Sequence, residues 1–132
     1  MYLREQEYQS LGLEVRWLDK AHAENAYKYA VQFTSKEKYD LNENAVKNIE
    51  HLNIESYSVA EHWISHRISS AGTVQVVYSD SEVCVINAAI FISKWKDIFC
   101  PSRDDAIILH NNSHTVLFYC HEEELEVGER NA

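Results

Sequence analysis

The stretch DAIILHNNSHTVLFYCH, residues 105–121, decides the fold class of this chain. Two apolar runs flank Asn111, Asn112 and Ser113, which are residue types typical of turns. This pattern predicts an antiparallel hairpin. A turn centred on Asn112 and Ser113 would place residue 110 opposite residue 115, and residues 104 and 105 opposite residues 121 and 120. The hairpin therefore predicts a sheet whose open end gathers acidic side chains.

The sequence before this hairpin predicts a second hairpin and one helix. Residues 73–78 are rich in β-branched side chains, and a Ser-Asp-Ser turn connects them to the apolar run 82–86. Residues 88–99 then carry apolar side chains at helical spacing, and Pro101 ends this helix. We expect antiparallel hairpins interrupted by one helix.

The first half of the chain is predicted to be mostly helical. Apolar side chains recur at three- and four-residue spacing over residues 21–34, 42–52 and 56–68, which indicates three amphipathic helices. Residues 13–17 alternate strictly and predict a strand. The expected fold class is α+β, a single domain over residues 1–132 with N-terminal helices packed on an antiparallel sheet of hairpins interrupted by one helix.

Composition predicts a folded protein of the cytoplasm. The 132 residues are 45% hydrophobic, which is enough for one core. The N-terminus has no basic region followed by an apolar run, and no apolar stretch is long enough for a membrane span. The three cysteines, Cys84, Cys100 and Cys120, are odd in number and widely spaced, which favours reduced thiols. The oligomeric state stays open.

The charge distribution indicates which class of partner the protein can bind. Residues 1–70 carry 11 acids and 8 bases, whereas residues 71–132 carry 10 acids and 4 bases. Such a surface repels nucleic acid and anionic membranes and attracts basic proteins. Clustered carboxylates also repel one another, and a basic partner would remove that repulsion. The predicted partner-binding residues are Asp104, Asp105, Tyr119, Glu122, Glu123, Glu124 and Glu126.

No pattern in the sequence specifies catalysis or a metal. His62 and His66 have the spacing of a helical metal pair, but a third ligand would have to come from elsewhere in the chain, for example His51. Cys120 adjoins His121, but neighbours on a strand point to opposite faces, and an acidic environment disfavours a thiolate. We therefore predict a protein that is not an enzyme, with no catalytic residues, no cofactor and no metal. Two alternatives stay open: a small enzyme with a Cys/His site on the C-terminal hairpin, and a dimeric interaction adaptor.

Residues 74–128 resemble small acidic immunity proteins of bacterial toxin systems, including the contact-dependent growth inhibition type. The relevant features are the Val-rich hairpin, the segment FISKW at 91–95, PSRDD at 101–105 before a strand, YCHEE at 119–123 and EVG at 126–128. The resemblance implies a cytoplasmic inhibitor that covers the active site of a cognate toxin domain, commonly a nuclease. A nuclease cleft is basic because its substrate is polyanionic, so an acidic surface suits it. In this interpretation the carboxylates steer and pair with the toxin, and Tyr119 is an apolar anchor.

Overall fold

The computed structural model describes residues 3–35 and 40–130 and confirms the α+β fold class. Within these ranges the helices are α1 (Leu3–Ser10), α2 (Lys20–Ala30), α3 (Tyr57–Ser65) and α4 (Ala88–Ile98), with a short 3-10 helix η1 (Val31–Phe33) after α2. The strands are β1 (Arg16–Trp17), β2 (Val46–Asn53), β3 (Thr73–Val77), β4 (Val83–Asn87), β5 (Ala106–His110), β6 (Thr115–Cys120) and β7 (Glu124–Arg130). All pairings are antiparallel, in the order β1-β4-β3-β5-β6-β7-β2.

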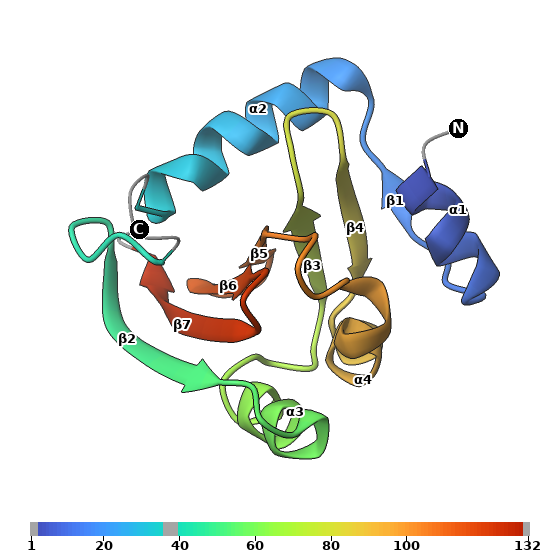
Figure 1. The fold of residues 1–132 in the computed structure, drawn as a ribbon. Helices are drawn as coiled ribbons and strands as arrows, with labels where there is room; N and C mark the ends of the chain where they lie inside the picture. The colour runs from blue at the N-terminus through green and yellow to red at the C-terminus, as the bar shows by residue number, and fades with distance from the viewer. Residues whose placement is uncertain (1–2, 36–39, 131–132) are drawn as a thin grey trace.

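Both faces of the sheet are covered by helices (Figure 1). Helices α1, α3 and α4 pack on one face, where Trp95 and Phe91 of α4 are almost fully buried. Helix α2 and η1 pack on the other face through Ala23, Ala30 and Phe33. The two cores explain why the central strands β5 and β6 are apolar on both faces.

Both predicted hairpins and the helix between them are confirmed. Strands β3 and β4 pair directly, and α4 follows β4 with the Asn87 side chain accepting a hydrogen bond from the Ile90 amide at 3.1 Å. Strands β5 and β6 pair Ala106 with Tyr119 and Leu109 with Val116, which is the predicted register. The predicted helices over 21–34 and 56–68 correspond to α2 with η1 and to α3.

The predicted helix over 42–52 is wrong, because residues 46–53 form the edge strand β2. The register between β2 and β7 shifts between Lys47 and Glu50, and Asn48 lies in the left-handed region with φ 55°. This β-bulge puts Val46 and Ile49 in contact with the same core, although they are three residues apart. The bulge therefore mimics the spacing of a helix.

Other boundaries also differ from the expectation. The predicted strand over 13–17 is paired only at Arg16 and Trp17. Helix α1 was not predicted, because its single deeply buried side chain, Tyr8, leaves no apolar stripe. The acids after residue 121 continue into a further strand, β7, which pairs on both sides with β6 and β2. In the described ranges, no helix combines the length and the apolar composition that a membrane crossing requires.

A network of ion pairs attaches α1 to the sheet. Arg4 donates to Asp104 at 3.1 Å and to Glu82 at 3.2 Å, and its guanidinium lies 3.7 Å from the centre of the Tyr78 ring. Arg103 donates to Asp104 at 2.8 Å and to Glu7 of α1 at 2.8 Å. The side chain of Asp104 is only 1% exposed, so both arginines compensate a buried carboxylate.

This network predicts a loss of stability in acid. Burial by itself would raise the pKa of Asp104, but hydrogen bonds from Arg103 and the Cys100 amide and the charge of Arg4 outweigh it, so the pKa lies below its ordinary value of 3.8. Hydrogen bonds from Arg103 likewise lower the pKa of Glu7 from 4.5. A carboxylate with a lowered pKa in the folded state contributes stability above its unfolded pKa, and that contribution disappears as the pH falls through the folded pKa.

We therefore expect the free energy of unfolding to decrease as the pH falls below about 4.5. Urea unfolding at a series of pH values measures this decrease. In Asp104→Asn the dependence should be shallower, since one of the two groups is then missing. An equal slope in the variant and the parent protein would contradict the assignment to Asp104.

Candidate functional site

The register of three neighbouring strands brings acidic side chains to one end of the sheet. Cys120 pairs with Glu124 across β6 and β7, and Asp105 precedes Ala106, which pairs with Tyr119, so that its side chain lies beside Cys120. Directly paired residues point to the same face, so these three side chains form a row. We call the carboxylates at this end the acidic corner, which consists of Asp105, Glu122, Glu123, Glu124 and Glu126.

The turn between β6 and β7 has only three residues and holds Glu123 in the left-handed region, with φ 60°. The Glu123 amide donates to the Cys120 carbonyl at 2.9 Å, and the Glu123 carbonyl accepts from the Ile54 amide at 2.9 Å. This position of a three-residue hairpin loop favours Gly or Asn. A glutamate here adds a carboxylate at a conformational cost, which is typical of functional positions.

Among the described residues, no Lys or Arg forms an ion pair with the acidic corner. Glu126 accepts from the Leu41 amide at 2.7 Å and contacts His51 at 3.1 Å. Glu123 accepts from the Tyr57 hydroxyl at 3.3 Å. The arginines near this end of the sheet form ion pairs with other carboxylates instead, namely those of Asp104, Glu7, Glu82 and Glu50. The corner therefore concentrates negative charge, and the bases that contact it in the described structure are two histidines, His51 at Glu126 and His121 at Asp105.

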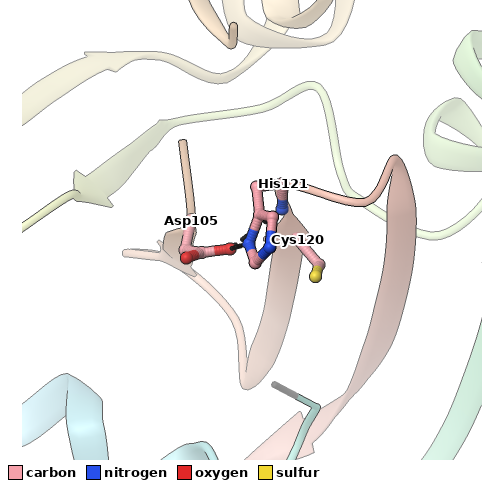
Figure 2. A group of neighbouring side chains, drawn as sticks. All are labelled: Asp105, Cys120 and His121. Atoms are coloured by element: carbon pink, nitrogen blue, oxygen red, sulfur yellow. Dashed lines mark hydrogen bonds and ion pairs between the residues drawn. The ribbon is translucent and has the colours of Figure 1, made fainter. Parts of the chain in front are cut away.

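Asp105, Cys120 and His121 converge inside the corner, which corrects the expectation that Cys120 and His121 point apart (Figure 2). Strand β6 ends at Cys120, so the alternation of side chains does not extend to His121, the first residue of the turn. The Asp105 carboxylate accepts from the His121 backbone amide at 2.9 Å and lies 2.8 Å from its Nδ1. One ligand atom from each of these three residues lies within 4.8 Å of the others.

The environment of Cys120 disfavours nucleophilic catalysis. Burial raises the pKa of this thiol, and the charges of Asp105, Glu122 and Glu124 raise it further. The hydrogen bond to Asp105 raises the pKa of His121, which favours the protonated imidazole over the neutral form that a general base requires. Cysteine enzymes instead hold their thiol in an electropositive, accessible site. The Cys/His pair on this hairpin therefore does not have the electrostatics of a nucleophile and its base.

Two of the predicted partner-binding residues do not lie at the surface. Asp104 is 2% exposed and belongs to the ion-pair network with Arg4 and Arg103. Tyr119 is also 2% exposed and stacks on Phe99, with ring centres 4.6 Å apart, so it is a core residue and not an anchor. Asp104 and Asp105 lie just before β5 and point to opposite faces of the sheet, Asp104 toward Arg4 of α1 and Asp105 into the cleft beside η1. The sequence alone does not tell which of these faces α1 covers.

Tyr57 is the aromatic residue that sequence reasoning missed at this site. It begins α3, is 43% exposed, and its hydroxyl contacts Glu123. Its ring also packs edge-on against Trp95 at 5.8 Å, which limits its motion. Exposed tyrosines beside charged groups are frequent contact residues in protein interfaces. The contact with Glu123 spans 66 positions in the sequence, so no local pattern indicates it.

A cleft of about 500 Å³ lies next to the corner, between η1 and the sheet. Its walls include Val31, Ile107 and Phe118, and Asp105 is the one charged residue among its described lining residues. An apolar cleft with a carboxylate at its rim suits a long basic side chain, because the stem contacts the apolar wall and the charged end reaches the carboxylate.

Of the other described histidines, only His51 contacts the acidic corner. His62 and His66 of α3 are exposed, with their Nε2 atoms 2.9 Å apart, and the described part of the chain adds no third ligand to them. His110 is buried, and its Nε2 contacts the Ser69 and Ala71 carbonyl oxygens. His51 contacts Glu126 and Asn53.

The fold and the site together define an α+β protein with helices on both faces of its antiparallel sheet. One end of the sheet carries a cluster of carboxylates that no described Lys or Arg pairs with. Comparison of the chain with protein-family models, with curated proteins and with solved structures found no match.

Proposed function

We propose that this chain is an immunity protein that binds a basic toxin domain, such as a nuclease, and covers its active site with the acidic corner. The observation that carries the proposal is the set of five carboxylates at one end of the sheet, with no Lys or Arg paired to them among the described residues. The resemblance of residues 74–128 to immunity proteins supports the same function.

The corner has the chemistry of an inhibitor surface. Nuclease clefts bind polyanions, so carboxylates in place of phosphates provide complementary charge and accelerate encounter. Tyr57 supplies an exposed aromatic side chain beside Glu123, and the cleft next to Asp105 receives one Lys or Arg side chain of the toxin. Clustered charge gives fast association, and the aromatic and apolar contacts slow dissociation.

The proposal predicts that neutralising the turn removes protection. The chain is first used to capture its partner from host lysate at low salt, and the captured protein is identified and expressed alone. We expect this protein to arrest growth and the chain to relieve the arrest. The triple variant Glu122→Gln, Glu123→Gln, Glu124→Gln should associate at least about tenfold more slowly at low salt, with a flatter salt dependence.

A matched control removes the same number of charges elsewhere. Glu14→Gln, Glu24→Gln and Asp97→Asn lie before β1, on α2 and on α4, outside the corner. This control should keep the parent association rate. The proposal fails if both triple variants slow association equally, since net charge alone would then explain the effect. It also fails if the captured protein is not toxic.

A further inference from the structure

Three kinds of metal ligand meet at the buried end of β6. One ligand atom each of the Cys120 thiol, the His121 imidazole and the Asp105 carboxylate lies within 4.8 Å of the others. Figure 2 shows the His121 ring next to the Asp105 carboxylate. The Cys120 thiol also lies within the same distance of carboxylate oxygens of Glu122 and Glu124, which form a second group around it. The sulfur is thus common to two sets of potential ligands on β5, the turn and β7.

We propose that Asp105, Cys120 and His121 form a binding site for a zinc-type divalent cation, with a carboxylate of Glu122 or Glu124 as the fourth ligand. Zinc binds sulfur, imidazole nitrogen and carboxylate oxygen, and four ligands complete its usual tetrahedral shell. A thiol and an imidazole together exclude magnesium and calcium, which prefer oxygen ligands. The site lies within the acidic corner but does not depend on the proposed inhibitor function.

Hydrogen bonds and strand pairing hold these ligands in place without a bound ion. Asp105 contacts both the amide and the ring of His121, at 2.9 and 2.8 Å, so the imidazole is held beside the thiol. Contacts that orient a histidine ligand are a regular feature of zinc sites. The cross-strand pairing of Cys120 with Glu124 fixes a carboxylate on the other side of the sulfur.

The burial of the ligands and the charge around them also favour the binding of a cation. Cys120 is 2% exposed, whereas the side chains of Asp105 and His121 are 38% and 32% exposed, so an ion reaches the sulfur from the solvent side through them. The surrounding carboxylates oppose a free thiolate here, and a bound cation reverses this effect because it binds the thiolate directly and releases the proton.

Cobalt(II) is the probe for this site, because a thiolate ligand gives bound cobalt a charge-transfer band in the near ultraviolet. The purified, reduced full chain is titrated with Co(II) and then with Zn(II). We expect one cobalt ion per chain, with the thiolate band, and displacement by zinc. Cys120→Ser should abolish the band, whereas Cys100→Ser, at the exposed thiol, should keep it.

Two further variants cover the case in which Cys120→Ser fails to fold. His121→Ala and Asp105→Asn change partly exposed side chains, and each should weaken zinc affinity at least about tenfold. His66→Ala removes the separate histidine pair of α3 and should leave the affinity unchanged. The proposal is overturned by the absence of a thiolate band in the parent chain, by a band that survives in Cys120→Ser, or by unchanged zinc affinity in both His121→Ala and Asp105→Asn.

Discussion

Asp104→Asn is expected to lower the free energy of unfolding by about 3 kcal/mol, which is the usual cost of removing one member of a buried ion pair. The Asp104 carboxylate accepts from Arg4, Arg103 and the Cys100 amide at 2.8 to 3.1 Å. An asparagine amide provides only one acceptor oxygen and turns its NH₂ group toward one of these donors. The Arg4 side chain, 14% exposed, then keeps its charge without its most buried partner.

Urea unfolding at neutral pH measures this cost. Asp97→Asn is the matched control, because Asp97 is an exposed residue of α4 and its change should cost no more than about 0.5 kcal/mol. Detachment of α1 in Asp104→Asn should also make the amides of residues 3–10 exchange faster with solvent. A loss below about 1 kcal/mol would show that the arginines are solvated well enough without this carboxylate.

Gly128→Ala is the second change with a large expected effect, a destabilisation of about 2 to 3 kcal/mol from overpacking. Gly128 of β7 lies under the bulge of β2, where an added Cβ would collide with Val46 Cγ1 and would lie 2.9 Å from the Lys47 carbonyl oxygen. Val46 is β-branched and 1% exposed, so it has no room to rotate away. Relief therefore requires the edge strand to move.

Two comparisons separate this steric effect from the general cost of replacing glycine. Gly12 has φ 72° and nothing within 4 Å of an added Cβ, so Gly12→Ala measures the strain of a left-handed backbone without any collision. Adding Val46→Ala to Gly128→Ala removes the contact with Val46 and should cost less than the sum of the two single changes. Strict additivity in thermal or urea unfolding would contradict the predicted collision.

The hairpins could be predicted from the sequence because their signals are local. The run 105–121 contains both strands and the turn, so the register of Ala106 with Tyr119 follows from the turn position. Strand β2 could not be predicted, because its partner β7 lies about 75 residues away and the bulge at Asn48 gives Val46 and Ile49 a helical spacing. Helix α1 was missed because ion pairs and Tyr8 hold it, without an apolar stripe.

Part of the candidate site could likewise be predicted from the sequence, and part could not. The order of residues predicts that acidic side chains gather at the end of the second hairpin. The structure places five of them there: Asp105, Glu122, Glu123, Glu124 and Glu126. The burial of Asp104 depends on the packing of α1, which the sequence does not indicate. Tyr119 is covered because Phe99 stacks on it. The convergence of Cys120 with His121 depends on where β6 ends and the turn begins.

The amino-acid order by itself determined the fold class, the two hairpins, the helix between them and the excess of acid at one end of the chain. These properties depend on neighbours within about a dozen residues, where periodicity and turn chemistry act directly. The tertiary structure alone decided which acids are buried, which edge strand completes the sheet and which ligands surround Cys120. Those outcomes depend on contacts between residues far apart in the sequence, such as Arg4 with Asp104, which are 100 positions apart, and no local pattern encodes which distant side chain supplies the partner.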